Sequence, residues 1–241
     1  MSSENGLFGK YNQYVCQIAG SYDIRFNDVV ELINNFQKEL DIVGNICEVG
    51  IKEGKSFIPL FLCRKQNEIG IAVDNSGKSK DIFLENINII LDQNKNVTKF
   101  LTIYTGDSNQ LDSETFLNVN NLTYRIFSIN GFQSVSSLLH NLNNAVNLMN
   151  EGGVIIISDY NNKRRPGIRF AVDTFLQTTQ SFIPVCLLYN KLILCNQIYF
   201  FHYAKLLNNT PHYSGIKKIK SSMDRHYKAE MWLGVKKQLS G

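Results

Sequence analysis

Three acidic residues stand at or near the ends of apolar segments and are the first candidates for chemistry. Glu48 lies just before Gly50, Asp74 closes "IAVD", and Asp107 follows the next apolar run in "YTGDS". The carboxyl ends of parallel strands meet at one edge of an α/β sheet, so these carboxylates are expected to line one cleft. A carboxylate there can accept hydrogen bonds from ribose hydroxyls, and glycines at 50 and 54 let a backbone approach its ligand. The pattern predicts a site for a nucleoside that carries no phosphate.

The segment "CEVGIKEGKS" (47–56) also invites comparison with a phosphate-binding loop, because it ends in Gly-Lys-Ser after an apolar run. Such a loop requires Gly-x4-Gly-Lys-Ser/Thr, which lets several backbone N–H groups surround a phosphate. Here only three residues separate Gly50 from Gly54, and position 49 is Val. The dinucleotide pattern Gly-x-Gly-x-x-Gly is absent as well. A nucleotide hydrolase that uses Lys55 is a remote alternative, kept open by "VIIISD", an apolar strand that ends in Asp159.

The composition is that of a folded globular protein. Of the 241 residues, 44% are hydrophobic and 19% are charged, which is too apolar for a disordered chain. The N-terminus shows no signal peptide, and the most apolar window, 182–203, has polar residues at its centre. We therefore expect two strands there and no transmembrane segment. Five cysteines without CxxC spacing predict neither a zinc site nor a disulfide framework, and favour a reducing, cytoplasmic location.

The positive charge is concentrated at the C-terminus. Residues 201–241 contain eight Lys or Arg against two acidic residues, a formal charge of +6, so residues 1–200 carry −2 of the total of +4. The segment is either a solvated surface or a binding surface for an anionic partner. No nucleic-acid-binding motif is present, so no nucleic acid is expected as a partner.

Apolar periodicity predicts alternating strands and helices. Strands are expected at 46–49, 70–73, 100–104, 125–129, 152–159, 185–189 and 191–195, and helices at 27–40, 56–63, 79–94, 134–149 and 167–180. Continuous apolar strands between helices indicate a parallel sheet with helices on both faces. Only Asn190 separates the last two strands, which is too short for a crossover helix, so one of them must run antiparallel.

On these residues the chain resembles the class I S-adenosylmethionine-dependent methyltransferases. The segments "CEVGIKEGKS", "IAVD" and "YTGDS" look like the first three cofactor motifs of that family. The closer resemblance is to a branch that modifies glycans and natural products, and it rests on "FSINGFQ", "NEGGVIIISDY", "PGIRFAV" and "YNKLILC". It covers about residues 40–200. It implies a Rossmann-like α/β fold, with a seven-stranded, mostly parallel sheet whose last strand is antiparallel.

The resemblance implies S-adenosylmethionine as the cofactor and assigns residues to the site. The residues expected to bind the cofactor are Glu48, Gly50, Gly54, Asp74, Asp107, Ser108 and Asn130. Asp159 is the catalytic candidate. The residues expected to contact the acceptor are Tyr160, Asn161, Arg164 and Arg165. The acceptor is expected to be a small molecule or a glycan, and an anionic one if the two arginines clamp it.

Two positions depart from the branch, which usually has Asp where this chain has Asn130 and His where it has Gln133. An amide is a poor metal ligand, and Gln takes up no proton at neutral pH. We therefore expect no metal site, and either metal-independent methyl transfer or a catalytically degenerate binding or scaffold protein. His202, His212 and His226 are the substitute bases considered, while His140 fits a surface or packed position on a helix.

The expected organisation has three parts. Residues 1–40 form an N-terminal helical extension, residues 41–200 form the S-adenosylmethionine-binding domain, and residues 201–241 form a basic segment that packs on that domain. The N-terminal helix either pairs subunits in a homo-oligomer or covers the sheet of its own chain.

Overall fold

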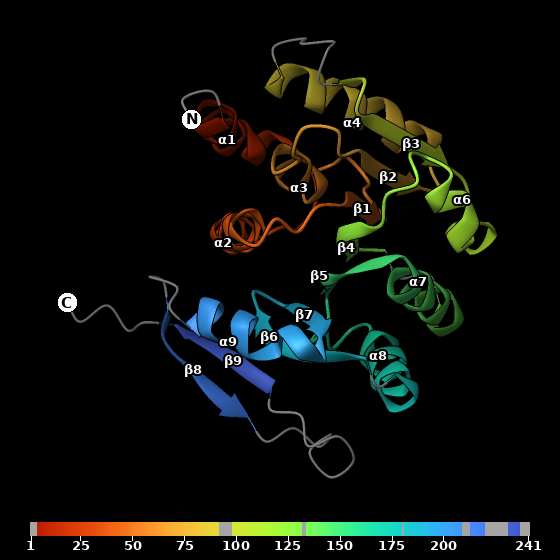
Figure 1. Ribbon diagram of the computed structural model, residues 1–241. Helices are drawn as coiled ribbons and strands as arrows, with labels where there is room; N and C mark the ends of the chain where they lie inside the picture. The colour runs from red at the N-terminus through yellow and green to blue at the C-terminus, as the bar shows by residue number, and fades with distance from the viewer. Residues whose placement is uncertain are drawn as a thin grey trace.

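One continuous β-sheet forms the centre of the protein in the computed structural model (Figure 1), which describes residues 4–91, 98–131, 134–179, 181–208, 213–219 and 231–236. The strand order is β3-β2-β1-β4-β5-β7-β6-β9-β8. The strands are β1 Asn45–Val49, β2 Gly70–Asp74, β3 Leu101–Thr105, β4 Tyr124–Ile129, β5 Met149–Ser158, β6 Phe182–Leu188, β7 Lys191–Asn196, β8 Tyr213–Ile219 and β9 Met231–Lys236.

The first seven strands confirm the predicted fold class. Strands β3, β2, β1, β4 and β5 pair in parallel, whereas β7 runs antiparallel to both β5 and β6. The turn between β6 and β7 is tight, because Tyr189 and Asn190 both have positive φ, at 49° and 62°, which is the geometry of a two-residue hairpin. Strands β8 and β9 were not predicted; β9 pairs in parallel with β6 and extends the sheet beyond seven strands.

Helices cover both faces of this sheet, as Figure 1 shows, with α7 and α8 on one side and α2 and α3 on the other. The helices are α1 Glu4–Tyr14, α2 Phe26–Glu39, α3 Phe57–Leu62, α4 Gly77–Ile90, α6 Ser113–Leu117, α7 Val135–Leu148, α8 Pro166–Thr178 and α9 Phe200–Asn208, with short 3-10 turns η1 Val15–Gln17, η2 Ser108–Gln110 and η3 Gln197–Tyr199. The five predicted helices match α2, α3, α4, α7 and α8, with small differences at their ends. Serine hydroxyls cap two of them, since Ser76 accepts from the N–H of Ser79 and Ser134 from that of Ser137.

Alternation along each strand divides the core between the two faces. In β1, Cys47 and Val49 pack in one cluster with residues of α7 and α8, whereas Ile46 packs in another with residues of α2 and α9. Helices α1, α3 and α4 contribute a third cluster that includes Phe57 and Phe83. Each β1 side chain therefore has a defined face. Glu48 shares the face of Ile46, because neighbours two apart in a strand point the same way.

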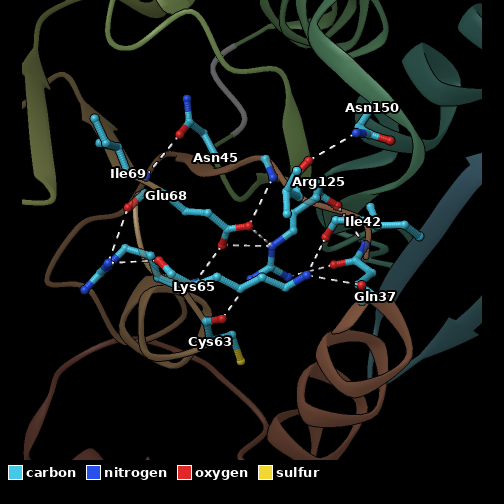
Figure 2. Close-up of polar contacts among 12 residues, drawn as sticks. Gln37, Ile42, Asn45, Cys63, Lys65, Glu68, Ile69, Arg125 and Asn150 are labelled. Atoms are coloured by element: carbon cyan, nitrogen blue, oxygen red, sulfur yellow. Dashed lines mark hydrogen bonds and ion pairs between the residues drawn. The ribbon is translucent and has the colours of Figure 1, made fainter. Parts of the chain in front are cut away.

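A buried polar network ties the N-terminal half of the sheet to its helices (Figure 2). Arg125 of β4 is fully buried; its Nε donates to both oxygens of Glu68, at 2.9 and 3.0 Å, and its Nη2 donates to the carbonyl of Cys63, at 2.7 Å. Its Nη1 donates to Gln37 of α2 at 2.7 Å. The Arg125 guanidinium and the Glu68 carboxylate are thus paired through charge-assisted bonds, which is what a buried ion pair requires. It stabilises the fold and lies apart from the cavities described below.

The apolar window 182–203 forms β6, β7, η3 and the start of α9, which confirms the prediction of two strands. Among the residues that the structure describes, no helix has the length and apolarity needed to cross a membrane. All five cysteines are free thiols.

Candidate functional site

Two adjoining cavities open at the carboxyl edge of the sheet. The first, which we name the β2 cavity, has a volume of about 240 Å³ and lies over the ends of β1 and β2. The second, the β7 cavity, has a volume of about 150 Å³ and lies between the loop before α2, the loop after β1 and the ends of β5 and β7. Lys52 and Asn130 line both, so the cavities adjoin there. This edge is where open α/β sheets bind ligands.

Asp74 is the predicted acidic residue that lines the β2 cavity. Its carboxylate accepts hydrogen bonds from the backbone N–H of Lys52, at 2.7 Å, and of Ser76, at 3.0 Å. These bonds fix the loop after β1 against the end of β2. A carboxylate has about four lone-pair positions, so both oxygens can accept further hydrogen bonds from a ligand.

The two loop glycines have different roles. Gly50 lines the β2 cavity with φ at +87°, and a Cβ there would lie 2.5 Å from the backbone nitrogen of Gly131. Only glycine permits this approach of two loops beneath the cavity. Gly54 lines neither cavity, and a Cβ at its position would collide with the ring of Phe83. It therefore shapes the loop and does not face a ligand.

Glu48 lies beneath the cavities and lines neither of them. It is fully buried and accepts hydrogen bonds from the hydroxyls of Ser56, at 2.5 Å, and Ser128, at 2.8 Å. Asn130 in turn donates to the Ser56 hydroxyl at 2.8 Å. Burial raises the pKa of Glu48, against the hydrogen bonds and the positive charge of Lys191, which lower it. Glu48 thus contacts the site only indirectly: it holds the hydroxyl of Ser56, and Ser56 lines the β7 cavity.

Asp107 does not join the other two acidic residues. It is exposed, lines neither cavity and caps η2 by accepting from the N–H and the side-chain amide of Asn109, at 2.9 and 2.8 Å. The geometry therefore gives no support to Asp107 as a cofactor ligand. Ser108, the next residue, is buried and lines the β2 cavity as expected. The acidic residue of this third motif is a cap, and its serine faces the cavity.

Asn141 of α7 lines the β2 cavity and was not singled out from the sequence. Its Nδ2 donates to Ser108 at 3.2 Å, whereas its Oδ1 has no hydrogen-bond partner although the side chain is only 2% exposed. A buried acceptor without a partner is unfavourable by about 1–3 kcal/mol. The cavity therefore offers a place for a ligand group that donates a hydrogen bond. Helical position alone did not reveal this, because Asn inside an amphipathic helix usually faces solvent.

Asp159, the catalytic candidate, lines the β7 cavity directly after β5. Its φ is 62°, and one carboxylate oxygen accepts from the side-chain amide of Asn190 at 3.1 Å. Of the four predicted acceptor residues, Arg165 lines the β2 cavity. Tyr160 is instead buried, and its hydroxyl donates to Asp173 at 3.0 Å.

The other two predicted acceptor residues lie outside both cavities. Asn161 is exposed, and its backbone N–H donates to Asn190 at 2.8 Å. Arg164 is exposed, and its backbone N–H donates to Asn162. All four residues follow β5, but Tyr160, Asn161 and Arg164 line neither of the two cavities.

Lys191 is the second residue that the sequence analysis missed. It is 6% exposed, it lines the β7 cavity, and its Nζ donates to Ser158 at 2.6 Å. Nζ also lies 5.4 Å from the ring centroids of Tyr22 and Phe26. Burial lowers the pKa of Lys191, while the nearby charges of Glu48 and Asp159 raise it. A usable signal was the two-residue alternation in "KLILC", which puts Lys191 on the same face as buried Ile193 and Cys195.

The metal-ligand chemistry of the site is sparse. In the described ranges, no group of three or more His, Cys, Asp or Glu side chains is placed to hold a metal ion. His140 contacts the carbonyl of Leu111 at 2.8 Å, and His202 packs beside the ring of Phe36. Gln133, His212 and His226 lie outside the described residues.

The geometry of the loop after β1 does not favour the nucleotide-hydrolase alternative. The Lys55 ammonium donates to the carbonyl of Gly20 at 3.1 Å, and the Ser56 hydroxyl donates to Glu48. In a phosphate loop these two side chains would serve the phosphates and the magnesium ion. Here both are committed to the protein.

Comparisons with known proteins identify the fold. No protein-family model matches the chain, and no curated protein matches it in sequence. Among solved structures, it is similar to an O-methyltransferase from Bacillus cereus in complex with SAH, with a TM-score of 0.56, 18% identity and coverage of 78% of this chain and 89% of that chain. It is also similar to the TDP-rhamnose 3'-O-methyltransferase of calicheamicin biosynthesis, with a TM-score of 0.56, 11% identity and coverage of 81% and 95%. A third is the O-methyltransferase TomG from Streptomyces achromogenes in complex with SAM, with a TM-score of 0.54, 11% identity and coverage of 80% and 88%. These likenesses establish a Rossmann-like fold shared with O-methyltransferases.

Proposed function

We propose that this protein is an S-adenosylmethionine-dependent methyltransferase that methylates an oxygen atom of a small molecule, such as a sugar or glycan. The observation that carries the proposal is the β2 cavity, where Asp74 and the close approach of Gly50 to Gly131 form a nucleoside-sized cradle. Structures with this fold include O-methyltransferases in complex with SAM and SAH. Fold likeness alone would be weak support for function, so the cavity residues carry the argument.

The residues present fit this cofactor. Asp74 would accept from the ribose hydroxyls, and Gly50 leaves room for the backbone to follow the ligand. The unpartnered Oδ1 of Asn141 suits the amino group of adenine, which is a hydrogen-bond donor. Asn130 lines both cavities and would contact the part of the cofactor that bridges them. When bound, S-adenosylmethionine supplies a sulfonium methyl group that an acceptor oxygen displaces.

The chain's own contribution would be binding, orientation and proton removal. Asp159 lines the β7 cavity and can accept a hydrogen bond from an acceptor hydroxyl. Arg165, at the β2 cavity, can pair with an anionic substituent of a larger acceptor. Orientation of reacting groups provides much of the acceleration of a displacement reaction.

We also propose that the reaction needs no divalent metal. Near Asp159 the other candidate ligands are the amides Asn130 and Asn190, which line the same cavity, whereas a Ca²⁺ site uses several carboxylate oxygens and a Mg²⁺ site usually one or two carboxylates together with waters. Transfer in the presence of EDTA should therefore equal transfer with added Mg²⁺. A strict dependence on added metal would contradict this part of the proposal.

Isothermal titration with S-adenosylmethionine, S-adenosylhomocysteine and ATP is the first test. Binding of the first two, with no heat from ATP, is the expected result, and no binding of either would overturn the proposal. A radiolabelled methyl-transfer assay with TDP-rhamnose then tests a sugar acceptor. Binding without transfer to a broad set of sugars, phenols and carboxylic acids would favour the degenerate binding protein, for which the amide at Asn130 is the sequence argument.

A further inference from the structure

The β7 cavity contains a buried amine that the proposed function does not yet use. Lys191 is the first residue of β7, directly after the tight turn at Tyr189 and Asn190. The antiparallel register pairs it with Ser158 of β5, whose hydroxyl accepts its hydrogen bond at 2.6 Å. The rings of Tyr22 and Phe26 bound it on another side, each 5.4 Å away. A flexible lysine side chain is thus fixed at one wall of a cavity.

The charged groups around Lys191 come from several elements. The negative charges of Glu48, in β1, and of Asp159, directly after β5, both raise the pKa of Lys191. The other charged residues that line the cavity are Asp23, Lys52 and Lys55. Of these, Asp23 pairs with Arg25, and Lys55 donates to the carbonyl of Gly20. The charges that shift the pKa of the amine are therefore the two acidic ones, and the Lys52 and Lys55 ammonium groups stand elsewhere on the cavity lining.

This charge balance selects the kind of group that can enter. An anion placed at Lys191 would lie beside the Asp159 carboxylate and, with the amine neutral as a base must be, would have no ammonium at that point to pair with, which is unfavourable in a partly buried site. A neutral hydroxyl meets no such repulsion. It can donate to the Asp159 carboxylate and lie within reach of the Lys191 amine. Two tyrosines, Tyr22 and Tyr189, line the same cavity. The Arg25 guanidinium lies over the Tyr189 ring, 4.7 Å from its centroid, so a sugar ring could pack only on the other face of that ring.

We propose that the β7 cavity is the acceptor subsite of the methyltransferase proposed above, that it binds a neutral hydroxylated ring, and that Lys191 is the base for the reacting hydroxyl. The inference rests on the proposed function. In the step, the hydroxyl proton passes to the lone pair of the Lys191 amine as the acceptor oxygen bonds to the methyl carbon. The carbon–sulfur bond of the donor breaks, and its electron pair stays on sulfur. The products are a methyl ether, a neutral thioether and the Lys191 ammonium, which returns its proton to solvent.

Two features of the site suit this role. The hydrogen bond to Ser158 uses an N–H of Lys191 and leaves the lone pair of the neutral amine available. Burial favours the neutral amine over the ammonium. Glu48 is buried as well, and its charge acts on Lys191. Because the pKa of Glu48 is itself raised, Glu48 and Lys191 both shift toward their uncharged forms.

The deciding experiment measures the ionisation of Lys191 in the unaltered full chain saturated with S-adenosylhomocysteine. Acetic anhydride acetylates only neutral amines, and mass spectrometry gives the extent of labelling of each lysine between pH 6 and 11. Lys78, exposed on α4 and outside both cavities, is the internal control. The expected midpoint for Lys191 is lower than that for Lys78. An equal or higher midpoint would mean that Lys191 stays an ammonium, and the base role would be overturned.

The same labelling tests the acceptor class. Saturating methyl α-L-rhamnopyranoside, a neutral sugar, should slow acetylation of Lys191 and leave Lys78 unchanged, whereas glucuronate should protect neither. Protection by glucuronate, or no protection by the neutral sugar, would overturn the assignment of a neutral acceptor to this cavity.

Variants then test catalysis with TDP-rhamnose as the acceptor. Lys191→Met and Lys191→Arg should both lower transfer by about 10²–10⁴-fold, the usual contribution of a general base, and Lys78→Met should not. Affinity for S-adenosylhomocysteine should stay unchanged in all three. Rescue by Arg would show that charge matters and not proton transfer, and absence of transfer by the wild type would count against a sugar acceptor. If the wild type fails to bind S-adenosylhomocysteine, the proposed function itself fails; if it binds but Lys191 titrates like Lys78, only this inference fails.

Discussion

At the scale of single residues, side chains with the same sequence signature have different physical roles. Asp74 and Asp107 are both acidic and both follow strands, yet Asp74 is 8% exposed and lines a cavity, whereas Asp107 is exposed and caps a short helix. Glu48 is more buried than either and contacts hydroxyl groups of the protein. An acidic residue at a strand end therefore has one of several roles, and of these three only Asp74 lines a cavity.

Replacement of Asp74 by Ala should weaken binding of S-adenosylhomocysteine by about 1.5–3 kcal/mol, or roughly 10- to 150-fold, because charged hydrogen bonds to ribose are lost. Asp107→Ala is the matched control and should change the affinity by no more than about threefold. Isothermal titration of both variants gives the comparison. Equal losses for the two variants would contradict the placement of the ribose at Asp74.

Asn141 leads to a prediction about the base of the cofactor. Its free Oδ1 should accept from the adenine amino group, so the wild type should bind S-adenosylhomocysteine about 10- to 100-fold more tightly than the deaminated analogue S-inosylhomocysteine. Asn141→Leu, which keeps the volume, should bind both ligands with similar affinity. Competition titrations of the two ligands measure this preference. A preference that survives in the variant would show that another group recognises the amine.

At the scale of secondary-structure elements, strand register gathers the polar groups of the site. Glu48 pairs with Ser128, and Ser158 pairs with Lys191, so residues distant in sequence lie on one face at one end of the sheet. The Arg125 network performs a separate task, since it connects β4 with α2 and with the segment before β2 through Gln37 and Glu68 (Figure 2). Polar residues of this fold therefore divide into one set for the site and another for the scaffold.

Breaking the buried ion pair should destabilise the protein strongly. Arg125→Met leaves the Glu68 carboxylate buried without its main partner, and the free energy of unfolding should fall by about 3–5 kcal/mol. Arg169→Met removes the exposed pair with Asp173, 3.7 Å apart and with side chains 55% and 31% exposed, and should cost at most about 1 kcal/mol. Urea unfolding of both variants provides the measurement. Similar losses would refute the structural role assigned to Arg125.

At the scale of the whole molecule, the site contributes to how stability changes with pH. Burial lowers the pKa of Lys191 in the folded protein below the value of about 10.4 for an exposed lysine. Between these two pKa values the unfolded chain binds more protons than the folded chain, so the free energy of unfolding rises with pH. Below the folded pKa, both states hold the proton and the contribution no longer changes with pH.

This linkage can be measured with one variant. Lys191→Met should show a smaller rise in the free energy of unfolding between pH 7 and pH 10 than the wild type, because the proton-linked contribution is absent. Lys78→Met should follow the wild-type curve. Urea unfolding at a series of pH values gives all three curves. Parallel curves for Lys191→Met and the wild type would show that the pKa of Lys191 is the same in the folded and unfolded chains.

Much of the fold was predictable from local patterns. Continuous apolar strands, amphipathic helices and the short link at Asn190 give an α/β sheet with an antiparallel strand, because each signal depends on nearby residues. Strands β8 and β9 were not predicted. They lie in the basic segment, where β8 carries lysines (YSGIKKI) and the apolar run of β9 (MWLGVK) is short, and β9 pairs with β6, which is distant in sequence.

The sequence by itself determined which segments form the carboxyl edge of the sheet and that Gly50, Asp74, Ser108, Asn130 and Asp159 stand there. Only the tertiary structure decided that Glu48 and Tyr160 turn inward, that Asp107 is a cap, and that Asn141 and Lys191 face the cavities. The physical reason is that spacing fixes a residue's position along its own element. Burial, charge environment and access to a cavity depend on neighbours that are distant in sequence, such as Ser158 beside Lys191.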